Sequence, residues 1–252
     1  MVRKDGVDRM KAIMQSNILK QAVNIAAETG PEIKIAVSKN GIRFVSVGED
    51  GVSAVVVECK KPAVKTVEVS KDGELYYLNS SKLAKKIKSS AKSITLTQEK
   101  NSGVLGIRRG YLNIKQPLIK TPDYAHTPVK QFHEGVKTVL TVPVTPLHEL
   151  FEVSSDISDC VRIIVDKNQF SIGSTKTGDS AKAVIPAKKC KKFKVGEAVD
   201  LRVTTTRLAN FLGHASGYVM FYLKNDYPVT TEIKVDAGVS ARQIVAPRGK
   251  EK

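Results

Sequence analysis

The sequence lacks the features that mark membrane-embedded and disulfide-bonded proteins. No run approaches the roughly 18 apolar residues that a membrane-spanning helix needs, and the opening MVRKDGVDRMKAIMQS has no apolar signal-peptide segment behind its basic residues. The three cysteines, Cys59, Cys160 and Cys190, are far apart and form no Cys-x-x-Cys pair. We therefore expect a soluble protein of the cytoplasm or nucleoid, or of the nucleus in a eukaryote.

Catalytic groupings are also scarce. The four histidines, His126, His133, His148 and His214, lie at no metal-ligand spacing and near no nucleophile in sequence. The stretch Gly173-Ser-Thr-Lys-Thr-Gly lacks the residue order of a phosphate-binding loop and leads into no helical pattern, so it predicts a turn between strands. We expect no enzyme activity, no cofactor and no metal site.

Acidic residues are few relative to basic ones. The chain has 25 Asp and Glu against 41 Lys and Arg, which gives a formal net charge of +16 and a pI near 9.7. Such a field attracts polyanions, so nucleic acid is the first candidate partner. A basic composition also occurs in proteins that merely live in a nucleic-acid-rich cytoplasm, so the arrangement of the charges has to decide.

The chain contains an internal repeat. Val37-Ser-Lys-Asn-Gly-Ile-Arg-Phe-Val and Val165-Asp-Lys-Asn-Gln-Phe-Ser-Ile lie 128 positions apart, and each alternates apolar and polar residues around a Lys-Asn turn, which predicts a hairpin. Two helical patterns are repeated at a similar offset: Ile18, Leu19, Ala22 and Ile25 by Leu147, Leu150, Phe151 and Ile157, and Leu83, Ile87 and Ala91 by Leu208, Phe211, Leu212 and Ala215. The order helix, strands, helix, strands therefore occurs twice.

These patterns predict an α+β fold of two similar domains, each with mostly antiparallel sheet plus two helices. Residues 116–136 hold three prolines and no sustained periodicity, so they predict a connector. The expected organisation is a basic extension at 1–9, a first domain at 10–117, an interdomain connector at 118–136 and a second domain at 137–252. The alternative is one continuous α+β domain in which similar hairpins arose by chance.

The second predicted helix carries a cationic face. Opposite its apolar stripe lie five lysines and no acidic residue, and lysine neutralises phosphates without reading bases. A merely solvated face is the alternative, although solvated faces usually mix charges of both signs. With weaker signals on the first and fourth helices, the predicted DNA-contacting residues are Lys20, Lys82, Lys85, Lys86, Lys88, Lys92, Arg207 and His214.

Two charged segments do not fit this simple picture. The third helix is acidic, with Glu149, Glu152 and Asp156 on its polar face, and would repel a phosphate. A second lysine cluster, Lys188 to Lys194 in PAKKCKKFK, lies between predicted strands. It is either an outer nucleic-acid patch or simply a solvated loop.

Four segments of the chain are characteristic when taken in order: Met10-Lys-Ala-Ile-Met-Gln-Ser-Asn-Ile-Leu-Lys, Asn40-Gly-Ile-Arg-Phe-Val-Ser-Val, Tyr227-Pro-Val and Ile244-Val-Ala-Pro-Arg. Together they resemble the DNA sliding clamps of the proliferating-cell-nuclear-antigen family, of the archaeal and eukaryotic type. The resemblance runs from about Met10 to Arg248 and implies the clamp fold, with three chains forming a homotrimeric ring of six domains around duplex DNA. It implies a polymerase processivity factor that binds DNA of any sequence and recruits DNA polymerase, clamp loader, flap nuclease and ligase through short peptide motifs.

The resemblance also implies two further sets of functional residues. The edges that join subunits would include Tyr111, Asn113 and Lys115 in the first domain and Ala181, Ala183 and Ile185 in the second. An apolar pocket for partner peptides would be formed by Val47, Val52, Leu118, Ile119, Tyr124, Pro228, Ile244 and Ala246. The alternative for these pocket residues is that they are only core and turn.

Two departures from the family keep other functions open. Clamps are commonly acidic outside, whereas this chain is basic overall, and its third helix is acidic where the family tends to have arginines. A monomeric basic DNA-binding processivity factor, a subunit of a heteromeric checkpoint clamp, and a structural protein that coats DNA are therefore the alternatives.

Overall fold

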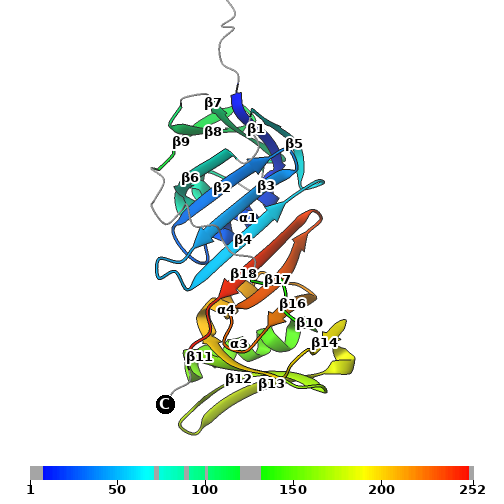
Figure 1. The fold of residues 1–252 in the computed structure, drawn as a ribbon. Coiled ribbons are helices and arrows are strands. Elements are labelled where there is room, and N and C mark those ends of the chain that lie inside the picture. The colour runs from blue at the N-terminus through cyan, green and yellow to red at the C-terminus, as the bar shows by residue number, and fades with distance from the viewer. Residues whose placement is uncertain (1–7, 71–73, 88–90, 100–101, 120–131, 250–252) are drawn as a thin grey trace, which may run out of the picture. The chain divides into compact units, whose positions relative to one another are not determined.

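The structure is a computed structural model that describes residues 8–70, 74–87, 91–99, 102–119 and 132–249 (Figure 1). The chain divides into two compact units. The first comprises residues 1–49, 55–128 and 236–241, and the second comprises 50–54, 129–235 and 242–252. Each unit therefore contains a short segment that is distant in sequence from the rest of it, which no periodicity had indicated.

The first unit consists of antiparallel sheet and two helices. One sheet has the strand order β5-β1-β7-β8-β9, and β4-β3-β2-β6 are successive neighbours in the other. The strands are β1 (Asp8–Gln15), β2 (Glu32–Ser38), β3 (Gly41–Val47), β4 (Ser53–Cys59), β5 (Val64–Val69), β6 (Glu74–Asn79), β7 (Ser93–Glu99), β8 (Val104–Arg109) and β9 (Leu112–Pro117), and the helices are α1 (Ser16–Ala26) and α2 (Ser80–Lys86).

The second unit likewise consists of antiparallel sheet and helices. Strands β14-β10-β16-β17-β18 are successive neighbours, and a separate sheet has the order β13-β12-β11-β15. The strands are β10 (Thr138–Pro143), β11 (Cys160–Val165), β12 (Gln169–Lys176), β13 (Asp179–Pro186), β14 (Lys192–Lys194), β15 (Val199–Thr204), β16 (Tyr218–Leu223), β17 (Val229–Asp236) and β18 (Val239–Val245); the helices are α3 (Thr145–Ile157), α4 (Thr205–Leu212) and the 3-10 helix η2 (Ala187–Lys189).

The two strand orders match position by position. In the repeat β5-β1-β7-β8-β9 corresponds to β14-β10-β16-β17-β18, and β4-β3-β2-β6 corresponds to β13-β12-β11-β15. Helix α1 follows β1 as α3 follows β10, and α2 follows β6 as α4 follows β15. The prediction of two similar α+β domains with two helices each is confirmed.

The predicted local patterns explain the core of each unit. In α1 the apolar face of Ile18, Leu19, Ala22 and Ile25 is 0–4% exposed, as expected for an amphipathic helix on a sheet. The Lys39–Asn40 turn joins β2 to β3, with Ser38 opposite Gly41. The equivalent hairpin joins β11 to β12, with Val165 opposite Phe170. The segment from Gly173 to Gly178 forms the β12–β13 hairpin rather than a phosphate loop.

Helix α2 is shorter than the sequence predicted. The apolar pattern of Leu83, Ile87 and Ala91 suggested three turns, but the helix ends at Lys86 and Ile87 is extended, with φ −90° and ψ 109°. The Ile87 side chain is nevertheless only 2% exposed, so it reaches the core although its backbone is extended. Burial of this apolar side chain therefore does not require the helix to continue past Lys86.

Two smaller boundaries also differ. Strand β1 begins at Asp8, within the segment predicted to be an extension. Helix α4 ends at Leu212, so His214 lies in the following turn, where its N–H donates to Phe211 O at 3.1 Å. His214 is therefore not on the helix face to which the sequence assigned it.

Candidate nucleic-acid interface and strand edges

Three of the predicted DNA-contacting lysines lie on the polar faces of the first unit's helices. Lys82 and Lys85 on α2 are exposed, and Lys20 on α1 is half-buried. Helices α1 and α2 pack against each other, so these side chains belong to one helical layer. Within the described part of the chain none of the three forms an ion pair, so their charge is available to an external anion.

The remaining lysines of the predicted cationic face are arranged differently. Lys86 Nζ donates to Lys115 O at 3.1 Å and to Gln116 Oε1, which ties α2 to the edge strand β9. Its role in the structure is therefore to hold a strand rather than to face a phosphate. Lys92 is exposed but lies in a bend before β7, not on α2. Lys88 lies outside the described residues.

Arg207, on α4, is committed to a carboxylate. Its guanidinium donates to Asp50 Oδ1 at 3.3 Å, to Asp50 Oδ2, and to Ser53 Oγ at 2.5 Å. These hydrogen bonds lower the pKa of Asp50 below its ordinary value. Because the pair is already neutral, Arg207 offers a phosphate little net attraction, which the sequence could not show since the partners are 157 positions apart.

Helix α3 is the equivalent of α1 in the repeat, but its polar face carries acidic residues where α1 carries Lys20. On this helix Leu147 and Leu150 are buried. The acidic residues Glu149, Glu152 and Asp156 are all exposed. The helix packs on β12 and β13. Its solvent face is thus as acidic as the sequence indicated.

Strand β9 is an edge strand of the first unit. Leu118 N donates to Gly103 O at 2.9 Å, which continues the β8–β9 ladder. Because the bonding direction alternates along an antiparallel strand, the N–H groups of Asn113 and Lys115 point away from β8. Tyr111, in the preceding turn, is fully exposed, and Leu112 is 47% exposed. An edge strand with outward N–H groups of this kind is a site for pairing with another chain, although the outward Lys115 O already accepts from Lys86 Nζ.

Strand β13 is the corresponding edge of the second unit's separate sheet. Ala187 N donates to Asn168 O at 2.8 Å, which sets the alternation in the β12–β13 ladder. The outward N–H groups are therefore those of Lys182 and Val184, not those of the predicted Ala181, Ala183 and Ile185. Ile185 is 2% exposed and belongs to the core, whereas Val184 is 47% exposed. The register of the β12–β13 ladder decides which N–H groups face outward, and the sequence carries no signal for it.

The residues predicted to hold partner peptides fall in both units, and each set is described by itself. In the second unit Ala246 N donates to Val52 O at 2.8 Å, and Val52 is 42% exposed. Ile244 is 6% exposed and Pro228, which directly precedes β17, is half-buried. In the first unit Val47, Leu118 and Ile119 are half-buried, and Tyr124 lies outside the described residues.

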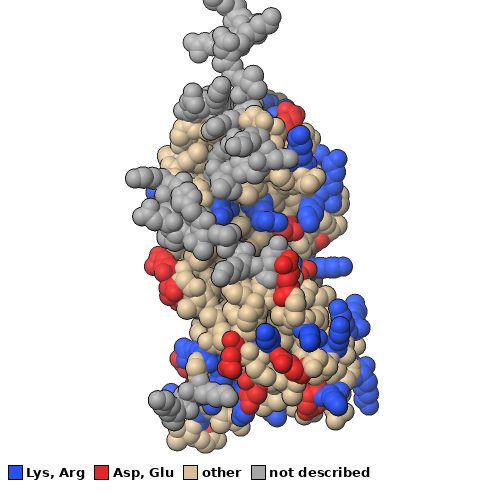
Figure 2. Space-filling model, viewed as in Figure 1, with Lys and Arg blue, Asp and Glu red and all other residues tan. Residues whose placement is uncertain are grey.

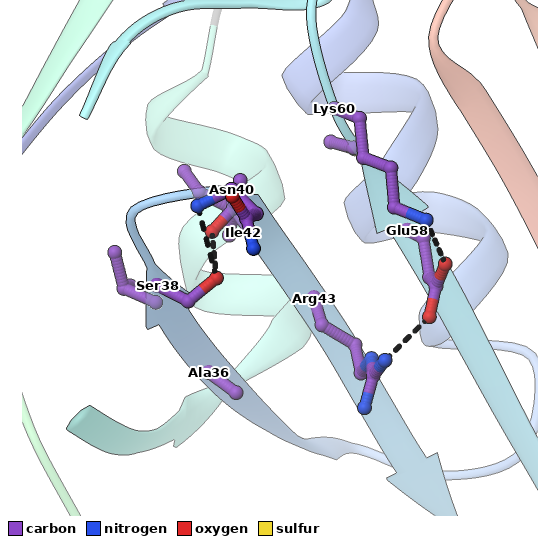
Figure 3. A pocket seen from close by; sticks show the side chains of 10 residues that line it. Ala36, Ser38, Asn40, Ile42, Arg43, Glu58 and Lys60 are labelled. Atoms are coloured by element: carbon purple, nitrogen blue, oxygen red, sulfur yellow. Dashed lines mark hydrogen bonds and ion pairs between the residues drawn. The ribbon is translucent and has the colours of Figure 1, made fainter. Parts of the chain in front are cut away.

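A cavity of about 360 Å³ opens beside the β2–β3 hairpin of the first unit (Figure 3). Glu58 accepts from Arg43 Nη2 at 2.6 Å and pairs with Lys60 Nζ at 3.0 Å. Burial opposes ionisation of Glu58, but the hydrogen bonds from Lys60 and Arg43 outweigh it and lower its pKa. Cys59 at the same cavity is buried, and burial raises the pKa of its thiol to about 12. The cavity therefore holds compensated charges and an inert thiol.

No group of three or more His, Cys, Asp and Glu among the described residues could hold a metal ion. No described helix is both long and apolar enough to span a membrane.

Comparison with known proteins identifies the architecture. No protein-family model and no curated protein sequence matches the chain. Among solved structures, A. fulgidus PCNA, bound to the C-terminal region of FEN-1, is similar with a TM-score of 0.83 and 18% identity, over 96% of this chain and 100% of that one. PCNA from Entamoeba histolytica (0.81, 15% identity, 96% and 100% coverage) and from Thermococcus kodakaraensis (0.80, 14% identity, 95% and 100% coverage) are similar too. The likeness over nearly the whole chain shows that this protein has the fold of the PCNA sliding clamps.

Proposed function

We propose that this chain is a sliding-clamp subunit, a non-enzymatic processivity factor that forms a homotrimeric ring around duplex DNA and recruits replication and repair enzymes through peptide motifs. The observation that carries the proposal is the pair of edge strands, β9 and β13, within a fold shared with three PCNA structures over nearly the whole chain. The internal repeat supports closure of these edges into a ring.

Strands β9 and β13 each have an equivalent in the repeat. The position of β9 corresponds to β18, and that of β13 corresponds to β4. Two backbone bonds link the segments flanking β4 and β18, each inside one unit: Lys60 N donates to Gly238 O at 2.8 Å, and Ala246 N donates to Val52 O at 2.8 Å. By the same geometry β9 of one copy would pair with β13 of the next. A head-to-tail contact of this kind generates a ring when its rotation closes.

The helical lysines provide the attraction for DNA. Lys20, Lys82 and Lys85 carry charges without carboxylate partners among the described residues. Point charges of this kind neutralise phosphates without reading bases, and their affinity arises from counterion release. This suits a protein that must slide along any sequence.

Recruitment is proposed to use the exposed apolar residues of the second unit. Val52, together with Pro228 and Ala246, offers aliphatic surface to an aromatic anchor of a partner peptide. The A. fulgidus PCNA structure is bound to the C-terminal region of FEN-1, which supports capture of a partner's chain segment by this fold. Ile244, at 6% exposure, contributes only as buried support.

Light scattering tests the ring. Replacing Asn113 with proline removes an outward N–H of β9 and leaves the β8–β9 ladder intact, because that N–H does not bond β8. The wild type and Asn113→Ala should have three times the chain mass, and Asn113→Pro should be a folded monomer. Raising the salt from 50 to 500 mM should favour the trimer, since like charge of +16 per chain opposes assembly.

A wild-type chain that stays monomeric at both salt concentrations would support the open, monomeric processivity factor instead. That alternative draws on the overall charge of +16, which could hold a monomer on DNA without a ring.

Calorimetric titration tests recruitment. A peptide with one aliphatic and two aromatic residues on a helical turn should bind the wild type with micromolar affinity, because exchangeable partners need only a small apolar anchor. Val52→Glu should abolish binding, while Val153→Glu, a matched change at another exposed valine, should leave it unchanged. Equal affinity in both variants would remove Val52 from the site.

A further inference from the structure

The segment from Lys188 to Lys194 carries five lysines in seven residues, in the sequence KKCKKFK. It forms the end of η2 and the short strand β14, and all five lysines are exposed. Figure 2 shows lysine and arginine atoms gathered along the edge of the second unit where Figure 1 labels β14. The proposed ring and peptide sites use none of these residues.

The backbone that carries these lysines is fixed, unlike that of a loose loop. Lys191 N donates to Thr141 O at 2.9 Å, and Cys190 N donates to Ala187 O at 3.0 Å. Strand β14 pairs with β10, with Lys194 opposite Val139 and Lys192 opposite Thr141. Lys191 Nζ lies 3.9 Å from the centroid of the Tyr218 ring, a cation–π contact that orders its side chain. The charges therefore project from a defined surface.

The charges of the cluster are not compensated by acidic side chains. Some lysines elsewhere pair with carboxylates, as Lys11 does with Glu68 at 3.4 Å and Lys60 with Glu58 at 3.0 Å. Within the described part of the chain none of the five forms an ion pair. The nearby Asp166 instead accepts from the backbone N–H groups of Asn168 and Gln169. Crowded like charges repel, and a polyanion would relieve that cost.

Protection of the strand edge explains only part of this pattern. Lysine on an edge strand discourages pairing with other chains, and β14 is an edge strand of three residues. Lys192 and Lys194 would suffice for that purpose. Lys188 and Lys189 lie on η2, outside any strand edge, so protection gives no reason for them.

The chemistry of the surface favours a phosphate backbone over a protein partner. Protein interfaces depend on buried aromatic or aliphatic anchors, but here Phe193 is half-buried in the strand and one face of the Tyr218 ring is occupied by Lys191 Nζ. The lack of a bare aromatic ring or an arginine among residues 187–194 also removes base stacking and bidentate base reading. Lysine point charges that contact phosphates are what remains.

We propose that η2 and β14 form a second nucleic-acid surface, which binds the phosphate backbone of a duplex without sequence preference and is separate from the lysines of α1 and α2. It does not require ring closure, so it goes beyond the proposed clamp function. A DNA segment held there would be additional to the one that the helices contact.

Four glutamines test the surface. The variant Lys188→Gln, Lys189→Gln, Lys192→Gln, Lys194→Gln removes four charges and leaves Lys191 on Tyr218. The matched control Lys61→Gln, Lys65→Gln, Lys176→Gln, Lys234→Gln removes the same charge from other exposed lysines that form no ion pair among the described residues. The probe is a fluorescent 30-base-pair duplex, titrated by anisotropy at several salt concentrations.

Log affinity falls with log salt, and the cluster variant should make this slope less steep by about 0.9 for each lysine that contacts a phosphate. The control should leave the slope unchanged. The same decrement should appear when Lys82 and Lys85 are already reversed to glutamate, which separates this surface from the helical one. An equal decrement in the control would mean that net charge alone is measured, and would overturn the proposal.

Lysine labelling read by mass spectrometry gives an answer that does not depend on how the variants fold. Duplex DNA should protect Lys188, Lys189 and Lys192 of the wild type from acylation, and should leave Lys61 and Lys234 reactive. Unprotected cluster lysines under saturating DNA would overturn the proposal. So would polyglutamate that protects them at lower concentration than DNA does, since the occupant would then be an acidic protein.

Discussion

The helices of the two units occupy equivalent places in the repeat but differ in electrostatics. In the first unit Lys20, Lys82 and Lys85 form a cationic layer without ion pairs among the described residues. In the second, α3 carries exposed acid and Arg207 of α4 is neutralised by Asp50. The buried faces are alike, since Leu83 of α2 and Leu208 of α4 are both 0% exposed.

The repeat thus preserves packing and leaves the solvent face free to vary. An apolar side chain that fills the space between helix and sheet is constrained by close packing. A charged side chain that faces solvent is not limited by packing, so its charge can change unless a binding partner contacts it. If DNA passes the helices, its phosphates should therefore be held mainly by the first unit, and charge changes on the two sets of helices should have opposite effects.

DNA affinity should respond most strongly to changes on α2. Reversing Lys82 and Lys85 to glutamate should weaken binding of a duplex by at least about tenfold. The slope of log affinity against log salt should become less steep by about 0.9 for each phosphate that is no longer neutralised. The mirror change in the second unit, Glu149→Lys with Glu152→Lys, should strengthen binding, because it removes repulsion. Anisotropy titrations at several salt concentrations measure both.

A matched control distinguishes a local effect on α2 from the effect of the changed net charge. Lys61→Glu with Lys65→Glu makes the same charge change on exposed lysines away from the helices, and it should alter affinity only slightly. If it weakens binding as much as the α2 reversal does, the asymmetry between the units has no bearing on DNA.

The sequence revealed those parts of the structure that rest on local periodicity. The apolar face of α1, the Lys39–Asn40 hairpin and its β11–β12 equivalent follow from spacing alone, and so does the two-fold order of elements. Both subunit edges that the family resemblance implied lie on edge strands; local periodicity did not indicate them. Which N–H groups face outward on β13 depends on register, which the sequence did not supply.

Contacts between distant residues could not be predicted. Helix α2 ends early because Ile87 is buried from an extended backbone, a tertiary effect that its helical spacing concealed. Lys86 looked like part of a cationic face but bonds to Lys115 O and Gln116 on β9. Arg207 pairs with Asp50 across most of the chain. In each case a candidate phosphate contact was decided by a partner that periodicity does not reveal.

Releasing Arg207 should have a weaker effect than reversing the α2 lysines. Asp50→Asn keeps a hydrogen-bond acceptor but removes the negative charge, so α4 gains an uncompensated cation and DNA affinity should rise by a few-fold at most. Stability at pH 7 should fall by less than about 1 kcal/mol, because both side chains are partly exposed and solvent screens the pair. Asp236→Asn, the same change at an exposed aspartate that accepts from the N–H of Ala237 and forms no ion pair among the described residues, is the control.

The pH dependence of stability in this variant tests the pairing directly. Hydrogen bonding to Arg207 lowers the pKa of Asp50 below its ordinary value of 3.8, so the ionised carboxylate is favoured in the folded state. A lowered pKa contributes stability that is present above 3.8 and is lost as the pH falls through 3.8 toward the folded value. Urea unfolding should therefore show a difference between wild type and Asp50→Asn at pH 7 that shrinks by pH 3. A difference that persists unchanged at pH 3, or that Asp236→Asn reproduces, would mean that Arg207 is not held by the charge of Asp50 and that α4 is as cationic as α2.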